Sequence, residues 1–366
     1  MTKIYGFVAE FNPFHNGHKL FIDQIKEKYH PDVLIAVMSG NFVQRGDFAI
    51  LDKWSRAKTA IENGVDLVIE LPFAYAVEPA QYFAKGAVEI LRLLNVDTIV
   101  FGTENQIDFE NVADRMISVD PVFQQNYQLN SADNLTNYYQ SIGIDISKSP
   151  NQLLGLNYVS QIIQQNSQIK VATIKRDVSE FSATNIRRKY SQQESIAELV
   201  PKLTDDSFTE QPIVTWDDYF PFLKYQITNQ STTELQQIYQ MVEGLENKFK
   251  KEISHSNNFD EFIEQVKSKR YTMARLRRLM IYTLLNVRES EINNVYKNPY
   301  LRVLGFNNVG QRYLNVLKKS EVELITRVGK KEKNILDLEI RADRIRQLVT
   351  SQEQNFGVIP YMKGVN

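Results

Sequence analysis

Two histidines three residues apart, His15 and His18, follow an apolar run near the amino end of the chain. Pro13 and Gly17 shape a turn between that run and a helical pattern beginning at about His18. Imidazoles at a helix start can donate hydrogen bonds to phosphate oxygens and to the charge that builds up when an α-phosphorus is attacked. The turn therefore predicts nucleotide chemistry.

Two other interpretations of this pair are a metal site and a structural turn. A zinc site would need further nitrogen or sulfur ligands, and the chain has no cysteine and only His30 and His255 besides the pair. No metal site is predicted from these residues. The second alternative is a pair of turn histidines held by local hydrogen bonds, but the strand, proline, glycine and helix around them favour phosphate binding.

The elements around this turn have an α/β pattern. Short apolar or β-branched runs, expected to be strands, lie at residues 4–10, 33–38, 67–71, 98–101 and 169–174. Helical patterns lie between them at residues 18–28, 52–63, 80–94 and 153–164, with Asp52 as an N-terminal cap. This alternation predicts a doubly wound, Rossmann-like parallel sheet, in which ligands bind at the carboxyl ends of the strands.

The length and composition predict more than this one domain. A chain of 366 residues with 43% hydrophobic content is long enough for two or three cores. We expect a catalytic domain at residues 1–190, with an insertion at about 108–149, and a mainly helical region at 191–366. Without cysteine, a signal-peptide pattern or a long apolar stretch, the protein is expected to be cytoplasmic, with no membrane partner.

Charge is distributed unevenly along the chain. Residues 265–346 hold 19 Lys or Arg against 8 Asp or Glu, a balance of +11, which leaves −12 for the rest of a chain with net charge −1. Such a basic helical segment suggests a surface for a polyanion, with nucleic acid favoured over membrane. The alternative is an ordinary solvated helical surface.

Several motifs together resemble one known family. The strand followed by Phe-Asn-Pro-Phe-His-Asn-Gly-His at residues 11–18 looks like the HIGH motif of the nucleotidyltransferase superfamily. The segment Ser-Gly-Asn-Phe-Val-Gln-Arg-Gly at 39–46 makes the match specific, and others lie at 52–57, 70–72, 101–104, 150–155 and 269–272. With these segments, the chain resembles the bacterial tRNA(Met) cytidine acetate ligase family.

The resemblance implies an enzyme that activates acetate with ATP to acetyl adenylate and then acetylates N4 of the wobble cytidine of elongator tRNA(Met). His15 and His18 would be catalytic. The implied ATP-binding residues are Phe7, Val8, Ala9, Glu10, Phe11, Asn12, Pro13, Phe14, Asn16, Gly17, Lys19, Leu20, Gly102, Asn151, Arg176, Ser182 and Arg187. Mg²⁺ is expected to accompany ATP, without identifiable protein ligands.

Some of these roles are more specific. Gly102 would allow close approach of the adenosine, and Arg176, or Lys175 beside it, would hold phosphate. Ser182 would cap a helix on which Arg187 reaches the β and γ phosphates. The alternative for this last pair is a capped helix with a solvated arginine.

The basic residues expected to bind tRNA are Arg45, Lys269, Arg270, Arg275, Arg277 and Arg278. Arg270, Arg277 and Arg278 are expected to share one side of a helix. Tyr271, Tyr282 and Tyr313 could stack on bases, although such aromatics more often belong to the core.

Two other functions remain open at this stage. One is an adenylyltransferase acting on a small phosphorylated metabolite, which would have no use for a long basic helical extension. The other is a non-catalytic nucleotide- and RNA-binding protein, against which the intact His-Asn-Gly-His sequence argues.

Overall fold

The computed structural model describes residues 2–103, 108–118, 136–137, 139–141, 150–175, 181–319 and 322–364. Most of the predicted insertion and Arg176 lie outside these residues, so their predicted roles stay predictions.

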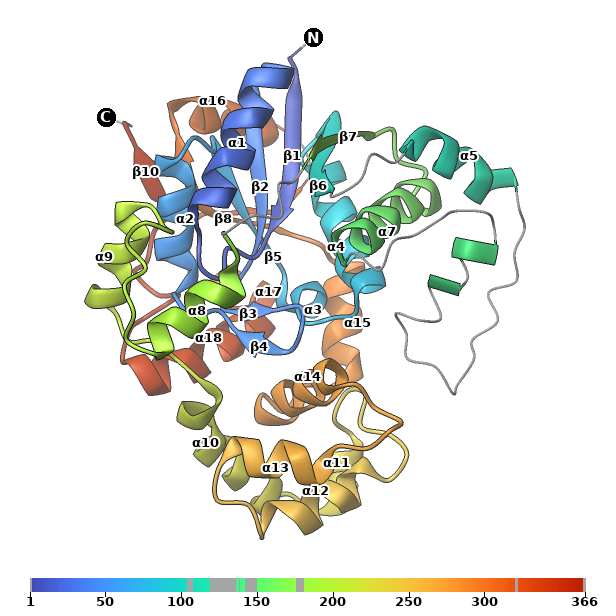
Figure 1. Ribbon diagram of the computed structural model, residues 1–366, viewed down its shortest axis with the longest axis vertical. Coiled ribbons are helices and arrows are strands. Elements are labelled where there is room, and N and C mark those ends of the chain that lie inside the picture. The colour runs from blue at the N-terminus through green and yellow to red at the C-terminus, as the bar shows by residue number, and fades with distance from the viewer. Residues whose placement is uncertain are drawn as a thin grey trace.

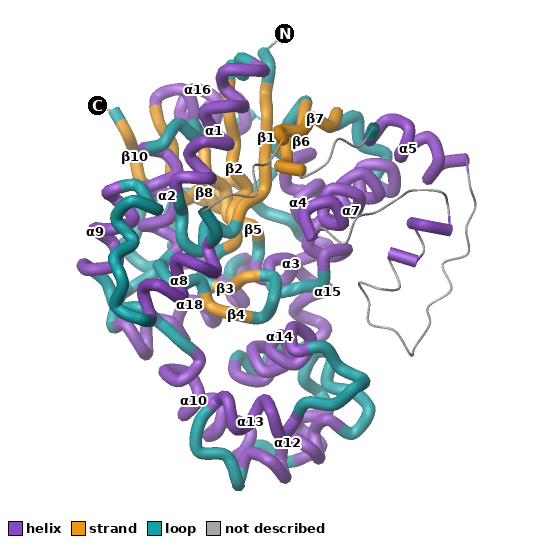
Figure 2. The backbone as a smooth tube through the Cα atoms, in the orientation of Figure 1, coloured by secondary structure: helices purple, strands orange, loops and turns teal. Residues whose placement is uncertain are grey.

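An eight-stranded sheet forms the centre of the molecule (Figures 1 and 2). Along the sheet the order is β10 (Tyr361–Lys363), β8 (Leu301–Asn307), β5 (Leu67–Leu71), β2 (Val33–Ser39), β1 (Ile4–Ala9), β6 (Thr98–Thr103) and β7 (Lys170–Lys175), with β9 (Leu324–Ile325) on β8. The five strands from β5 to β7 are parallel and are the five predicted ones. The predicted parallel α/β sheet is confirmed.

Helices cover both faces of the sheet because its central strands are apolar on both sides. In β2, Leu34 and Ala36 join a core with α1 (Asn16–Tyr29) and α2 (Lys53–Glu62). Ile35 and Val37 join a second core with α4 (Ala80–Leu93) and α7 (Pro150–Gln164). Asp52 caps α2 as predicted, accepting the Ser55 N–H at 2.8 Å.

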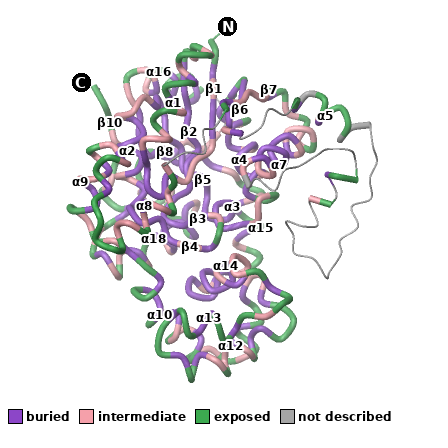
Figure 3. Tube along the Cα trace, viewed as in Figure 1, coloured by how far each residue is buried: buried purple, intermediate pink, exposed green. Residues whose placement is uncertain are grey.

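The second half is mainly helical, as predicted. Helix α8 (Ala183–Ser191) ends at the predicted boundary. The helices that follow it are α9 (Lys202–Glu210), α10 (Trp216–Asn229), α11 (Thr232–Gln236), α12 (Leu245–Ile253), α13 (Phe259–Val266), α14 (Met273–Leu284), α15 (Glu289–Lys297), α16 (Asn308–Leu317), α17 (Lys330–Ile335) and α18 (Asp337–Thr350). Helices α10 to α14 form a lobe at the lower end of the molecule in Figure 1, with an exposed outer surface in Figure 3.

Three strands that the sequence did not predict also come from this half. β8 pairs antiparallel with β5, β10 pairs parallel with β8, and β9 extends the sheet beside β8. The central sheet therefore contains chain from both sides of residue 190, and the division at that residue stays a prediction.

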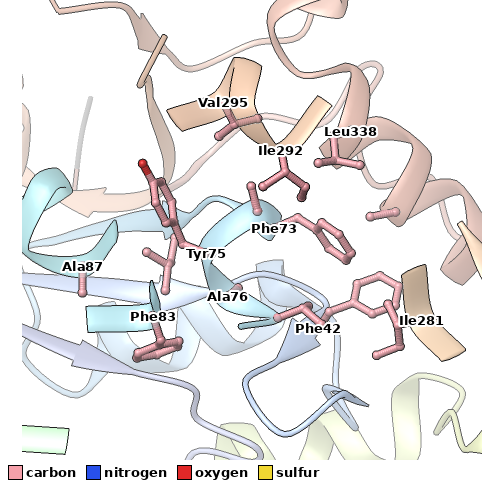
Figure 4. Close-up of a cluster of buried hydrophobic side chains, with 14 of the residues drawn as sticks. Phe42, Phe73, Tyr75, Ala76, Phe83, Ala87, Ile281, Ile292, Val295 and Leu338 are labelled. Atoms are coloured by element: carbon pink, nitrogen blue, oxygen red, sulfur yellow. The ribbon is translucent and has the colours of Figure 1, made fainter. Parts of the chain in front are cut away.

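A short hairpin, β3 (Phe42–Val43) and β4 (Asp47–Phe48), follows β2 and lies between the sheet and α14 (Figure 1). Phe42 packs edge to face on Phe73 of α3 (Phe73–Ala76), with ring centroids 5.3 Å apart. Figure 4 shows this pair in one apolar cluster with Ile281 of α14, Ile292 of α15 and Leu338 of α18. The hairpin is thus attached to the helical half by buried apolar contacts.

A buried charge cluster lies at the base of the hairpin. Lys53 Nζ contacts Glu70 Oε1 at 2.8 Å and Asp343 Oδ2 at 2.6 Å, and Arg302 lies 3.4 Å from each carboxylate. Asn41 donates to Asp343 at 2.8 Å. Two positive and two negative charges satisfy one another here, so the cluster links α2, β5, β8 and α18 at fixed geometry.

Across the part of the chain that the structure describes, every helix is too short or too polar to span a bilayer. One short helix, α5 (Phe109–Ser118), belongs to the region predicted as an insertion and packs on α7.

Candidate active site

The predicted histidine pair lies at the carboxyl end of β1, where the chain turns into α1. Phe11 has a left-handed backbone (φ +48°), and the Asn12–Pro13 peptide is cis. His15 caps α1 and is 2% exposed. The turn that the sequence placed at the sheet edge is therefore present, and its side chains are largely enclosed.

The two imidazoles lie against each other. Their ring centroids are 3.7 Å apart with planes inclined by 22°. The His15 backbone N–H donates to His18 Nδ1 at 3.2 Å, and the His18 N–H donates to the His15 carbonyl at 2.8 Å. Because Nδ1 accepts, a neutral His18 carries its proton on Nε2. The local backbone thus fixes the orientation and the tautomer of the second imidazole.

The position of the His15 ring leaves room only for glycine at residue 17. A Cβ atom at position 17 would lie 3.0 Å from Cε1 and Nδ1 of the His15 ring and 3.1 Å from Cβ of Phe181. These contacts are tighter than ordinary van der Waals distance, so any other residue would displace the imidazole. The predicted shaping role of Gly17 has a direct steric basis.

The side chains of the two asparagines of the motif form hydrogen bonds to the backbone of the protein itself. Asn12 accepts the Ile50 N–H at 2.8 Å and donates to the Phe48 carbonyl at 3.4 Å. Asn16 donates its side-chain amide to the Glu198 carbonyl at 2.9 Å. Asn12 thus joins the turn to the segment after the hairpin, while Asn16 anchors the start of α1 to the segment before α9.

The predicted helix start with Ser182 and Arg187 lies beside the histidine turn. Ser182 caps α8 by accepting the Asn185 N–H at 3.1 Å. Arg187 donates through Nη1 to the Asn12 carbonyl at 2.5 Å and through Nη2 to Thr184 at 3.4 Å. Burial lowers the pKa of Arg187. The structure thus brings together the turn and the arginine, which are 175 residues apart in the chain.

The remaining predicted ATP residues fall into three groups. The side chains of Phe7, Phe11 and Phe14 are buried in the core under α1, so these residues can face a nucleotide only with their backbone. Lys19 and Leu20 are exposed on α1, and Lys19 pairs with Asp23 at 2.9 Å. The third group lies around the carboxyl edge of the sheet. It consists of Val8, Ala9 and Glu10 at the end of β1, Pro13 in the turn, Gly102 at the end of β6 and Asn151 at the start of α7.

Arg56 belongs to the motif segment at residues 52–57 and is not among the predicted site residues. It is 1% exposed and donates to five backbone carbonyls. Among them are the carbonyls of Glu10 at 2.6 Å, Ser39 at 3.0 Å, and Gly40. Burial lowers the pKa of Arg56 to about 10. This guanidinium holds the carboxyl ends of β1 and β2 together.

The hairpin tip adds further charged groups to this region. Glu10 accepts the Gln44 N–H at 2.7 Å, and burial raises the pKa of Glu10 while nearby Arg45, Arg56 and Arg187 lower it. Arg45 is exposed at the tip, as a nucleic-acid contact would require. Sequence reasoning did not single out Gln44 or Asp47, although both flank the Arg-Gly pair at the tip.

The predicted tRNA surface needs two corrections. Arg278 is 9% exposed, and its Nη1 atom donates to the Gln44 carbonyl at 3.4 Å, so it belongs to the packing between α14 and the hairpin. Arg270 precedes α14, whose cap is Thr272, so it does not share a helical side with Arg277. The pattern suggested one continuous helix because basic residues surround the boundary on both sides.

The other predicted tRNA contacts lie at the surface. Lys269 and Arg270 are exposed, and Arg270 pairs with Glu243 at 2.7 Å. Arg275 lies over the Tyr271 ring at 4.5 Å, and Arg277 is half-buried. The three tyrosines considered for base stacking are each at most 8% exposed. Tyr271, Tyr282 and Tyr313 therefore belong to the core, which was the alternative to stacking.

The positive balance of the basic segment is smaller at the surface than in the sequence. Three of its arginines, Arg278, Arg302 and Arg346, are buried and bind carbonyls or carboxylates inside the protein. Arg346 donates to the Ala49 carbonyl at 2.8 Å, beside the hairpin. Part of the charge that predicted a polyanion surface therefore stabilises the fold.

Comparison with known proteins agrees with this geometry. The model of the HIGH Nucleotidyl Transferase family matches residues 2–357. The chain therefore belongs to the HIGH nucleotidyl transferase family, and its α/β sheet with a histidine pair at the end of β1 is the expected framework of that class.

Relatives narrow the assignment. The chain is 40% identical to a tRNA(Met) cytidine acetate ligase of Lactobacillus delbrueckii, covering 98% of this chain and 99% of that protein. It is 39% identical to a protein of the same name from Streptococcus agalactiae, covering 99% and 98%. Within its class, the chain belongs to the tRNA(Met) cytidine acetate ligase family.

A solved structure supports the same placement. The fold matches Thermotoga maritima TmcAL bound with alpha-thio ATP at a TM-score of 0.87 and 28% identity, covering 99% of each chain. The apo form of that protein matches at a TM-score of 0.86.

Proposed function

We propose that this protein activates acetate with ATP and acetylates N4 of the wobble cytidine of elongator tRNA(Met). The observation that carries the proposal is the stacked His15 and His18 pair at the start of α1, with Arg187 held against the same turn. Relatives with the ligase name over nearly their whole length support the substrate assignment.

The first half-reaction needs groups that stabilise negative charge. An acetate oxygen attacks the α-phosphorus of ATP, the bond to the β-phosphate breaks, and acetyl adenylate and pyrophosphate form. His15 and His18 would donate to the phosphate oxygens as charge builds up on them. Arg187 would meet the departing phosphates as a guanidinium fork. The solved structure of Thermotoga maritima TmcAL bound with alpha-thio ATP supports ATP as the nucleotide.

Mg²⁺ would arrive with the triphosphate. The described residues contain no group of three or more His, Asp or Glu side chains suited to hold a metal. Phosphate oxygens and water would supply ligands of the ion.

The second half-reaction needs a surface for RNA. Arg45 at the hairpin tip and Lys269, Arg270 and Arg275 before and on α14 are at least partly accessible. Phosphate contacts by such residues would give tRNA affinity that falls with salt. Replacing one of them should reduce the salt slope by about 1.

Two measurements test this function. Acetate-dependent exchange of pyrophosphate into ATP reports the first half-reaction, and labelled acetate transferred to tRNA(Met) reports the second. His18→Ala should keep its fold and lower exchange by about 100-fold or more. His255→Ala, which changes an exposed histidine of the helical lobe, is the matched control and should exchange at the wild-type rate.

The outcomes separate the competing functions. Exchange that depends on a phosphorylated metabolite in place of acetate would identify an adenylyltransferase of small molecules. ATP binding without either product would identify a non-catalytic protein. Normal exchange in both His15→Ala and His18→Ala would show that the histidines do not act in the chemical step.

A further inference from the structure

Unpartnered polar groups gather where the hairpin meets α14. Among the described residues, the Gln44 side-chain nitrogen Nε2 and the Nε atoms of Arg277 and Arg278 are buried without a hydrogen-bond partner. Buried polar groups are paired in the large majority of cases, so three such donors at one junction require an explanation. A ligand that supplies acceptors is the simplest one.

The junction is tightly defined. A Cβ atom at Gly46, where φ is +73°, would lie 2.3 Å from the Arg278 nitrogen and 2.9 Å from Cβ of Arg277. Gly46 therefore brings the hairpin backbone directly onto α14. Gln44 and Asp47 flank Gly46 in the chain, and β4, which contains Asp47, contacts α14.

Asp47 supplies an acceptor at the same place. Its side chain is half-buried, its Oδ1 accepts the neighbouring Phe48 N–H at 3.0 Å, and no described residue forms an ion pair with it. Burial raises the pKa of Asp47, while the nearby charges of Arg277 and Arg187 lower it. The carboxylate thus lies near both the α14 arginine and the arginine that contacts the histidine turn.

These three groups match one edge of cytosine. Its exocyclic amine donates hydrogen bonds, while its N3 and O2 atoms accept them. A carboxylate beside guanidinium and amide donors presents the complementary pattern, and enzymes read bases taken out of the stack through this edge. Uracil would place an oxygen opposite the carboxylate and would be disfavoured.

We propose that Asp47, Arg277 and Gln44 bind the Watson–Crick edge of the target cytosine, and that Asp47 accepts the proton released from N4 during transfer. This inference rests on the proposed function. The N4 lone pair forms a bond to the acetyl carbon, the bond from that carbon to the AMP oxygen breaks, and AMP leaves with the electron pair. The N4 proton moves to the Asp47 carboxylate, so atoms and charge balance.

The position relative to the histidine turn fits this role. Asn12 of the turn contacts the Phe48 carbonyl and the Ile50 N–H, and Arg187 bridges the turn to the vicinity of Asp47. The acetyl adenylate formed at the turn and a base held by the hairpin would therefore be neighbours. A tRNA phosphate is a weaker candidate for this junction, because the Asp47 carboxylate would repel it.

The test separates the two half-reactions. Asp47→Asn keeps the shape of the side chain but cannot accept the proton. We expect acetate-dependent pyrophosphate exchange within twofold of wild type, tRNA(Met) affinity within about threefold, and single-turnover acetyl transfer about 100-fold slower or worse. Asp217→Asn, an exposed change on α10, is the matched control and should transfer at the wild-type rate.

A second variant tests whether Arg277 binds the Watson–Crick edge of cytosine. Arg277→Gln should slow transfer and weaken competition by tRNA(Met) more than by tRNA(Met) carrying uridine at the wobble position. Arg275→Gln should weaken both competitors equally, as a phosphate contact would.

The failures are distinguishable. If Asp47→Asn transfers at the wild-type rate while wild-type protein acetylates tRNA(Met), the inference is wrong and the proposed function stands. Tighter tRNA binding in Asp47→Asn with unchanged transfer would indicate a phosphate site, which also overturns it. Wild-type protein that never acetylates tRNA(Met) would remove the proposed function and this inference with it.

Discussion

The substitution Arg56→Lys tests whether one buried guanidinium sets the ends of β1 and β2. Arg56 donates five hydrogen bonds to five carbonyls, and lysine keeps the charge but has at most three donors. At least two buried carbonyls then lose this partner, at about 1–3 kcal/mol each. We expect a loss of about 2–6 kcal/mol in the free energy of unfolding.

Urea unfolding measures this loss. Arg92→Lys, at an exposed position on α4, is the control and should change the free energy of unfolding by less than about 0.5 kcal/mol. Pyrophosphate exchange should also fall in Arg56→Lys, because the Glu10 and Gly40 carbonyls would no longer be held in place. A loss of stability below about 1 kcal/mol would refute the reasoning, since the carbonyls would then have other partners.

Three further predictions concern the histidine turn and residues that stabilise the fold around it. Gly17→Ala should keep the free energy of unfolding within about 1 kcal/mol of the wild-type value, since alanine favours a helix. Pyrophosphate exchange should fall about tenfold, because the added methyl group displaces His15, and exchange at the wild-type rate would refute this prediction. Burial raises the pKa of Glu78 to about 7, so the unfolded chain releases this proton at lower pH than the folded protein does, and wild-type stability should fall between pH 4.5 and about 7. In Glu78→Gln this fall should disappear, and at pH 8 the variant should be more stable than wild type by up to about 3 kcal/mol. An unchanged pH profile of stability would contradict this. Arg278→Gln should lower the stability of the protein in urea without changing the salt slope of tRNA binding, because Arg278 is buried. A reduced slope would show that Arg278 contacts RNA phosphate.

The order of strands and helices in the first half could be read from the sequence. Apolar runs of strand length alternate with amphipathic patterns there, and both signals are local. The turn at residues 11–18 was also readable, because proline, glycine and two histidines at fixed spacing restrict both backbone and chemistry. β8 was missed because it depends on pairing with β5, more than 200 residues away in the chain. β10 was missed because it is only three residues long and pairs with β8.

Charge by itself could not divide surface from interior. Arg277 and Arg278 are adjacent in the sequence, yet Arg277 is half-buried while Arg278 is buried and donates to the Gln44 carbonyl of the hairpin. A helix turns by about 100° per residue, so neighbours face different surroundings, and only the packed structure decides which surroundings those are.

The sequence alone determined the fold class, the position of the histidine pair and the chemistry that such a pair favours, since these follow from local pattern and residue type. The tertiary structure decided which distant groups reach that pair. Arg187 meets the turn, Arg56 ties two strand ends, and the hairpin brings Asp47 to α14 because buried apolar packing and carbonyl contacts fix their positions across long separations in the chain.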